Sequence, residues 1–418
     1  MTRLIYGPSR AGRLDQFRPA AEARSGSPKY LAFQIDSGGW NNILMQFEIM
    51  VVLAWLTGRT MVLPPKARMY LLGEDYLSLL DFFDRDALDS HLDVLTPEEF
   101  IAREGLGDEL ATHEDFHRHM SDCGHSPGWN GMEDALAHPG NALTARFELI
   151  PRLFGRRPVG IVGEVEDCDI LYFPTTKKHR MFGVAEVFFL FGEPQDERRA
   201  RTLLRDSIRY RREIIEQAEG ALRSPPLAGK DFGAMHIRRG DFQYHNTRIE
   251  AANIVAHTEN LFRVGQTIYV ATDEHDPEFL KPLRDRYSVV TLGDLDADFV
   301  AAIPYHWLGI IETLVCAAAP GRFVGTRLST FSARISILRG HMSLTPESDL
   351  AGIDTALYYT QPPFRHTSSQ SREPYGKPAA KHADALGETD QSWWESQWSV
   401  PVWGRAYKAV WAETDVDD

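Results

Sequence analysis

The stretch HIRRGD (236–241) places a histidine, two arginines and an aspartate directly after small and apolar residues. Two positive charges at the end of a buried segment are costly unless negative charge meets them. An arginine fork matches phosphate oxygens with two parallel hydrogen bonds. Gly240 allows a sharp turn, and Asp241 can orient one guanidinium. The stretch therefore predicts either an anion site or an internal Arg–Asp ion pair, and its position alone favours neither.

A second stretch, GTRLSTFSARI (325–335), has the pattern of a strand end, a turn and a helix start. Ser329 or Thr330 can cap the helix, and the free N–H groups at a helix N-terminus attract anions. A plain N-cap needs only one hydroxyl. Two loops of this kind in one sheet, one with arginines and one with a hydroxyl-rich helix start, suggest a clamp for a diphosphate.

The elements around both stretches alternate between short apolar strands and helices. Strands are expected at 233–237, 267–273, 288–292 and 322–326, and helices at 249–264, 276–287, 306–319 and 329–340. This alternation is typical of a doubly wound α/β domain, in which ligands bind beyond the carboxyl ends of the strands. Both polar stretches are expected at such strand ends.

The N-terminal half contains a β-α-β unit. A strand at 30–35 is followed by the turn DSGGWNN (36–42), an apolar helix at 43–57 and a strand at 60–65 that two prolines stop. Such a unit favours a parallel sheet. Further strands are expected at 159–163 and 169–173, with one long charged helix at 198–222.

We expect four parts in the chain. They are a lead-in at 1–28, an N-terminal α/β domain at 29–226, a C-terminal Rossmann-like domain at 227–345, and a linker with a tryptophan-rich tail at 346–418. The Pro/Gly break SPPLAGKD (224–231) marks the domain boundary. Five tryptophans between 393 and 411 predict that the tail packs back onto another domain.

Composition excludes some classes of function. The 418 residues carry a net charge of −14 with scattered Lys and Arg, which is unlike a nucleic-acid binder. No apolar stretch approaches a membrane span, and no apolar signal core is present. The three cysteines form no CxxC pair, as expected of thiols in a reducing compartment, so a cytoplasmic location is expected. No H-E-x-x-H motif occurs, and the acidic runs DCD (167–169) and DLDAD (294–298) are expected to be solvated loops, so no metal site is predicted.

The motifs together resemble those of the GDP-fucose-dependent fucosyltransferases of GT-B architecture, which include protein O-fucosyltransferases, α1,6-fucosyltransferases and nodulation-factor fucosyltransferases. HIRRGD resembles their H-x-R-R/x-x-D peptide, and residues 38–65 resemble their glycine-rich loop, helix and strand. YVATDE (269–274) and FVGTRLSTFSARI (323–335) resemble their two later donor-site motifs. The resemblance implies two Rossmann-like domains facing each other across a cleft. It spans about 30 to 340 but leaves 66–230 and the tail uncovered.

The resemblance implies roles for individual residues. Arg238 matches the arginine that contacts the donor β-phosphate and stabilises the departing charge, with Asp241 beside it as the second catalytic residue. The implied donor-binding residues are His236, Arg238, Arg239, Glu312, Ser329, Thr330, Phe331, Gly38, Gly39, Asn41 and Asn42. Asp36 and Glu48 are weaker expectations on the acceptor side. Glu312 stands where the family usually has an aspartate that reads the guanine N–H edge. Some members place a glutamate base in the glycine loop, but here that position is Gly38 or Gly39.

The implied activity is an inverting, metal-independent transfer of fucose from GDP-fucose to a hydroxyl of a protein or glycan, with no other cofactor. Two alternatives remain. One is a related transferase that uses another nucleotide sugar, which Glu312 would permit. The other is a non-catalytic sugar-nucleotide or glycan-binding protein. An oxidoreductase is disfavoured because no G-x-G-x-x-G follows any strand. The acceptor, the linkage and any catalytic base are not determined by the sequence.

Overall fold

The computed structural model describes residues 28–107, 110, 112–124, 147–149, 168–175, 189–191, 194–242, 248–326 and 329–343. The expected strand at 159–163 and the tail at 346–418, with its predicted packing, lie outside these residues, as does the lead-in up to residue 27. The chain forms two compact units, one ending at Arg211 and the other beginning at Arg212, and each is described by itself.

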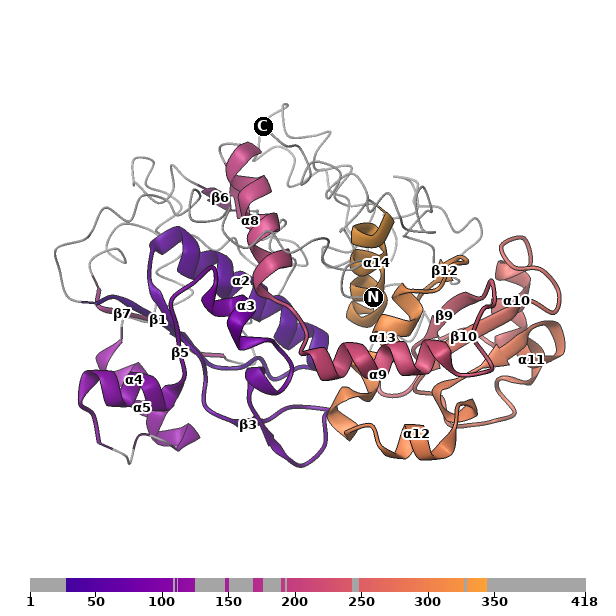
Figure 1. Ribbon diagram of the computed structural model, residues 1–418, viewed down its shortest axis with the longest axis horizontal. Helices are drawn as coiled ribbons and strands as arrows, with labels where there is room; N and C mark the ends of the chain where they lie inside the picture. Colours follow the sequence, from indigo (N-terminus) through magenta and orange to yellow (C-terminus); the bar gives the residue numbers. More distant parts are fainter. Residues whose placement is uncertain are drawn as a thin grey trace. The chain divides into compact units, whose positions relative to one another are not determined.

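The N-terminal unit is built on a parallel sheet with the strand order β5-β2-β1-β7 (Figure 1). The strands are β1 (Tyr30–Phe33), β2 (Thr60–Val62), β5 (Val94–Leu95) and β7 (Ile170–Phe173). The expected strands at 30–35, 60–65 and 169–173 are therefore confirmed. The strand order changes direction between β1 and β7, and ligands bind α/β sheets at such switch points.

Helix α2 (Trp40–Thr57) connects β1 to β2 and begins three residues earlier than expected. Most of its side chains are buried, because it is apolar on nearly every face. Gly58 ends the helix with a left-handed φ of 61°. The Arg59 N–H then donates a hydrogen bond to the Ala54 carbonyl at 3.0 Å.

The other elements of this unit are short. They are β3 (Ala67–Arg68), β4 (Tyr76–Leu77), η2 (Leu79–Asp81), α3 (Arg85–Asp89), α4 (Pro97–Glu104), α5 (His113–Cys123), β6 (Phe147–Leu149), β8 (Phe189–Phe191) and α8 (Pro194–Ser207).

The prediction of a single long helix at 198–222 is wrong. The segment forms two helices, α8 and α9 (Arg212–Arg223), separated by an extended stretch. In that stretch Tyr210 pairs with Phe83 as an antiparallel bridge, and the Arg211 N–H donates to the Phe82 carbonyl at 2.9 Å. The Tyr210 ring also stacks on Phe83 at 5.5 Å. These tertiary contacts replace the helical hydrogen bonds that the local sequence favours.

The C-terminal unit has a parallel sheet with the order β11-β10-β9-β12. Its strands are β9 (Gly233–Ile237), β10 (Thr267–Thr272), β11 (Ser288–Val290) and β12 (Phe323–Val324). Its helices after α9 are α10 (Ala251–Thr258), α11 (Lys281–Arg286), η6 (Leu292–Asp294), α12 (Ala297–Ala301), η7 (Tyr305–Trp307), α13 (Leu308–Ala317) and α14 (Thr330–Ser343). The expected alternation is confirmed, and the order changes direction between β9 and β12.

The two units divide at Arg211–Arg212, about 15 residues before the expected boundary at 226–227. Helix α9 belongs to the C-terminal unit because it packs against α13. Its apolar face, with Ile214, Ile215 and Ala218, is buried.

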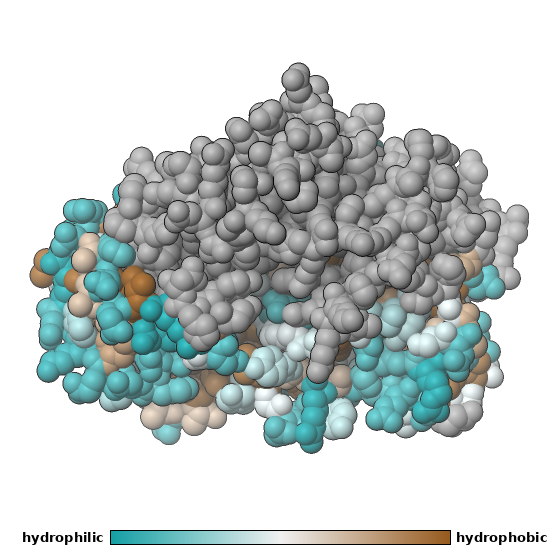
Figure 2. All heavy atoms as spheres, turned by 180° about the vertical axis from the view of Figure 1, so that it is seen from behind, coloured by the Kyte–Doolittle hydropathy of each residue, from teal (hydrophilic) through white to brown (hydrophobic). Residues whose placement is uncertain are grey.

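One face of the described residues shows how polar and apolar side chains are distributed on it. Figure 2 shows that the described part of one face is largely hydrophilic, with hydrophobic residues in small scattered groups. Among the described helices, none combines the length and the apolarity needed to cross a bilayer.

Candidate active site

The carboxyl end of β9 is joined to the segment after β12 by one threonine. All five residues of β9 are buried, and the chain leaves the sheet at Arg238. The Arg238 N–H donates to Thr326 Oγ1 at 2.9 Å, and the Thr326 hydroxyl donates to the His236 carbonyl at 2.9 Å. HIRRGD and the start of α14 are thus held together where the strand order reverses, the place where such sheets bind ligands.

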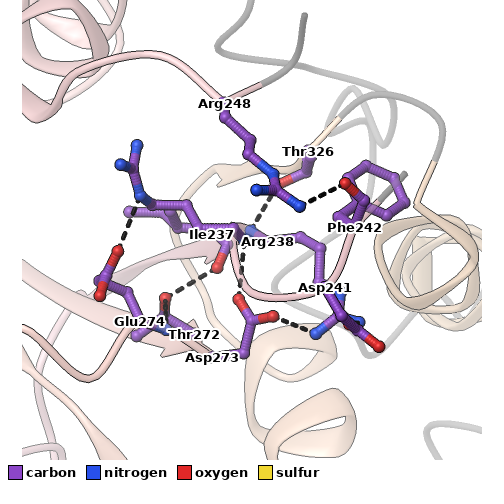
Figure 3. A network of polar contacts seen from close by, with 10 residues as sticks. Ile237, Arg238, Asp241, Phe242, Arg248, Thr272, Asp273, Glu274 and Thr326 are labelled. Carbon is purple, nitrogen blue, oxygen red and sulfur yellow. Dashed lines mark hydrogen bonds and ion pairs between the residues drawn. The ribbon is translucent and has the colours of Figure 1, made fainter. Parts of the chain in front are cut away.

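The Arg238 guanidinium lies between two carboxylates, as Figure 3 shows in part. It forms ion pairs with Asp241 and with Asp273, and its side chain is 22% exposed. Asp273 also accepts the Arg239 N–H at 2.7 Å. Two of the five guanidinium N–H groups are used in these contacts, so the others can serve a ligand.

Asp241 therefore orients Arg238 as the sequence suggested, and the structure adds Asp273 as a second partner. Asp273 was missed because it lies 35 residues further along the chain, at the end of β10. The signal was present in YVATDE, where an acidic pair follows an apolar strand. Register pairing of Thr272 with Ile237 places that pair beside the end of β9.

The Arg239 side chain makes its contacts inside the protein. Its Nε donates to Glu274 at 2.8 Å and its terminal nitrogen donates to the Ile249 carbonyl at 2.8 Å. The guanidinium also lies over the Phe279 ring, 4.1 Å from its centroid. Of the two interpretations of HIRRGD, the internal ion pair is observed for both arginines: Arg238 pairs with Asp241 and Asp273, and Arg239 pairs with Glu274. The two side chains are exposed to nearly the same extent, 22% and 21%.

His236 is buried between a ring and a hydroxyl from α14. Its imidazole stacks on Phe331 with the centroids 4.4 Å apart, and its Nδ1 lies 2.7 Å from Ser332 Oγ. Burial lowers the pKa of His236 to about 3, and the nearby Arg238 charge acts in the same direction. The imidazole is therefore neutral at physiological pH. Ser332 and Thr326 were missed by the sequence analysis, although both stand in the quoted motif.

Helix α14 begins beside this network. Ser329 precedes its first residue, and the Ser329 carbonyl accepts the Ala333 N–H at 3.0 Å, which closes the first turn. Ser329 is buried, and the Thr330 and Phe331 side chains are half-buried. The helix N-terminus thus lies at the switch point together with His236 and Arg238, and its N–H groups form a positive end suited to an anion.

A cavity of about 330 Å³ lies at the carboxyl end of β10. Its lining includes Thr272, Glu274, Arg284, Thr291, Leu292 and Glu312. Glu312 is half-buried on α13, and burial raises its pKa to about 8, with the Asp273 charge adding to the effect. Most of the lining residues are polar or charged, with Val270, Pro277, Leu280 and Leu292 as the apolar part, so the cavity offers hydrogen-bonding groups beside apolar surface.

The glycine-rich loop belongs to the N-terminal unit, at the switch point between β1 and β7. Asp36 accepts the Gly38 N–H at 2.7 Å, and its own N–H donates to Gln46 at 2.7 Å. Gln46, which the sequence analysis did not single out, also donates to the Gln34 carbonyl at 2.9 Å. The buried side chains of Asp36 and Gln46 therefore fix the loop, and Gly39 caps α2.

The remaining candidates of this unit lie in α2. Asn41 and Asn42 are in its first turn, and the side-chain oxygen of each is buried without a hydrogen-bond partner among the described residues. Glu48 is buried two turns further on. These residues lie in the other unit from Arg238, so the structure groups the sequence-predicted residues into two sets, one in each unit.

The acidic run at 294–298 serves to start helices. Asp294 accepts the Thr291 N–H at 2.8 Å, and Asp296 accepts the Phe299 N–H at 2.9 Å at the N-cap of α12. Asp298 follows in the first turn of α12, and Asp169 lies at the start of β7. In the part of the chain that the structure describes, no three His, Cys, Asp or Glu side chains gather as metal ligands would.

Replacing Gly240 with alanine is expected to reduce the activity of this site strongly, by about 10-fold or more. A Cβ at this position would lie 2.5 Å from Asp273 Oδ2 and would push this carboxylate away from Arg238. Steady-state kinetics check this, with Gly265→Ala as a control for the general cost of a substituted loop glycine. Activity of Gly240→Ala equal to that of the control would contradict the assigned geometry.

The fold and the site together define the structural class of this protein. Two parallel α/β sheets, one of them with a basic strand end and a helix N-terminus at its switch point, define an α/β protein of two Rossmann-like units. The family model for GDP-fucose protein O-fucosyltransferase matches residues 30–342, and the chain belongs to this family. It is thus a member of a fucosyltransferase family.

Solved fucosyltransferase structures resemble the chain at low identity. The crystal structure of POFUT1 in complex with GDP-fucose is 16% identical, with a TM-score of 0.43, covering 76% of this chain and 96% of that one. The NodZ α-1,6-fucosyltransferase soaked with GDP-fucose is 11% identical, with a TM-score of 0.42 and coverages of 75% and 93%. The NodZ structure from Bradyrhizobium is 10% identical, with a TM-score of 0.43 and coverages of 75% and 94%. No curated protein matches the chain.

Proposed function

We propose that the protein transfers fucose from GDP-fucose to a hydroxyl group of a glycan or protein with inversion at the anomeric carbon. The observation that carries this proposal is the placement of Arg238 at the β9–β12 switch point, oriented by Asp241 and Asp273 and next to the start of α14. This arrangement offers cationic and N–H groups on one side, as a leaving diphosphate requires.

In the proposed reaction the bond between the fucose anomeric carbon and the β-phosphate oxygen breaks, and its electron pair stays on the phosphate. The acceptor oxygen forms the new bond from the opposite face, and its proton passes to the solvent. Negative charge therefore develops on the diphosphate, where Arg238 and the N-terminus of α14 stabilise it. Both groups are fixed before the donor arrives, so little reorganisation is needed.

The cavity at β10 is proposed to hold guanine, with the Glu312 carboxylate accepting hydrogen bonds from the ring N–H and the amino group. A buried site that pairs polar groups rejects ligands lacking them. GDP should therefore raise the melting temperature more than UDP, CDP or ADP in a thermal-shift assay. An equal shift with UDP would support another nucleotide sugar as donor, which the longer Glu312 side chain permits.

The affinity for GDP should rise with pH. Free Glu312 has a pKa of about 8, so it is mostly protonated at neutral pH, whereas two N–H donors require the carboxylate. Binding thus releases a proton, and the affinity should gain up to about tenfold per pH unit below 8 and level off above it. Calorimetry checks this, with UDP as the control for titration of the phosphates. In Glu312→Gln, the pH dependence of the GDP affinity that exceeds that of UDP should vanish. If this additional dependence persists, another group is responsible for it.

We propose that the reaction needs no divalent metal. The carboxylates of the 294–298 run are bonded to backbone N–H groups at helix starts, and Arg238 provides the charge that a metal would otherwise supply. Activity should persist in excess EDTA and change little with added manganese. Complete loss in EDTA, restored by manganese, would overturn this part of the proposal.

A cytoplasmic location is also proposed. It is supported by three cysteines that are free thiols: Cys123 is exposed, Cys168 half-buried and Cys316 buried. Cell fractionation tests the location.

Screening glycan and peptide acceptors with GDP-fucose tests the acceptor class. GDP binding without any turnover would support the non-catalytic alternative.

A further inference from the structure

The hydroxyl of Ser332 is placed so that the position of its proton can be deduced. Ser332 is fully buried in the first turn of α14, and its Oγ accepts the Thr326 N–H at 2.9 Å. The same Oγ lies 2.7 Å from His236 Nδ1. Among the residues that the structure describes, no other group accepts from this hydroxyl. The single hydroxyl proton therefore points to Nδ1, because a buried O–H without an acceptor would be costly.

His236 carries only one ring proton, because its surroundings disfavour the imidazolium form. It is 4% exposed, stacks on Phe331 and lies two residues from the Arg238 charge. With Nδ1 occupied as an acceptor, the ring proton must be on Nε2. No described group accepts a hydrogen bond from Nε2, so this N–H is available to a ligand at the same strand end.

We propose that Ser332 is a positioning residue that fixes His236 as the Nε2–H tautomer and directs this neutral donor toward the donor diphosphate. The proposal rests on the proposed function, because the ligand of Nε2–H is the leaving group of that reaction. The neutral Nε2–H donates a hydrogen bond to the diphosphate, in addition to the charge of Arg238. Because the imidazole stays neutral, this contact requires no proton to be lost or gained.

The close approach of the segment after β12 to helix α14 supports a specific role for Ser332. A Cβ at Gly325 would lie 2.7 Å from both Cβ and Oγ of Ser332. Glycine at 325 therefore lets Ser332 reach Thr326 and His236 together. The same backbone segment supplies Thr326, whose hydroxyl bonds to the His236 carbonyl at 2.9 Å. Both the ring and the main chain of His236 are thus held by residues 325–332.

The test is nitrogen NMR of selectively ¹⁵N-histidine-labelled full-length protein, with the His236 signals assigned by their loss in His236→Gln. We expect wild-type His236 to show one protonated and one bare nitrogen, with Nε2 protonated, across the neutral pH range. Protonation of Nδ1 in the wild type would overturn the proposal, and this measurement needs no variant of Ser332 to fold.

Two variants then test the positioning. Ser332→Ala should change the His236 nitrogen shifts and lower kcat about tenfold with little change in KM. Ser332→Thr keeps the hydroxyl and should restore the shifts and most of kcat. The proposal would be overturned if Ser332→Ala left both the nitrogen shifts and kcat unchanged. It would also be overturned if Ser332→Thr restored neither of them. Absence of fucosyl transfer in the wild type would reject the proposed function instead, while the nitrogen shifts would still decide the role of Ser332.

Discussion

Arg238→Ala is expected to lower kcat/KM for fucosyl transfer by at least about 10²–10³-fold, because one preorganised charge at a developing anion contributes about 3–4 kcal/mol. The structure adds a second reason. Removing the guanidinium leaves Asp241 and Asp273 without their shared partner, so two carboxylates would face the diphosphate. Donor affinity should fall together with kcat.

The control for Arg238→Ala is Arg263→Ala, which removes an arginine from an exposed ion pair with Asp231. That variant should keep full activity. Arg238→Lys should recover little, because a lysine cannot contact two carboxylates and a phosphate with a planar fork. Circular dichroism and the melting temperature verify the fold of each variant. Normal donor turnover by a folded Arg238→Ala protein would refute the proposed site.

Arg339→Met is expected to lower the free energy of unfolding by about 3 kcal/mol or more. Arg339 is fully buried, and its guanidinium donates to the carbonyls of Ala319 at 2.8 Å and Gly321 at 2.7 Å, with longer contacts to Cys316 and Ala317. It thus satisfies the free carbonyls at the C-terminus of α13, at the negative end of the helix dipole. Methionine fills similar space but leaves these acceptors without donors.

Urea unfolding measures this effect, and Arg68→Met is the matched control. Arg68 pairs with Glu74 on the surface, so its loss should change the free energy of unfolding very little. Arg339→Lys should lie between the two, because a lysine has the charge but fewer donors. Equal stability of Arg339→Met and wild type would show that α13 does not depend on this cap.

The sequence by itself determined the local helices and strands, and it showed that charged residues directly follow the ends of buried strands. Apolar runs of four to six residues bounded by turns, such as 30–35 and 233–237, are too short for typical helices and indicate buried strands. The end of β9 and the start of α14 are likewise local, since Gly240 and the hydroxyls at 329–330 mark a turn and a helix start. The family resemblance came from these same local patterns.

Only the tertiary structure decided which side chains meet. The pairing of β10 and β12 with β9 brings Asp273 and Ser332 to residues 35 and 96 positions away. It gives Arg238 its second carboxylate, Asp273, and places Arg239 beside Glu274 and Phe279. In the N-terminal unit, the bridge between Phe83 and Tyr210 interrupts the helix expected at 198–222. Strand pairing and burial depend on contacts between distant segments, and the free energy of such contacts exceeds the weak local preferences that a sequence pattern reports.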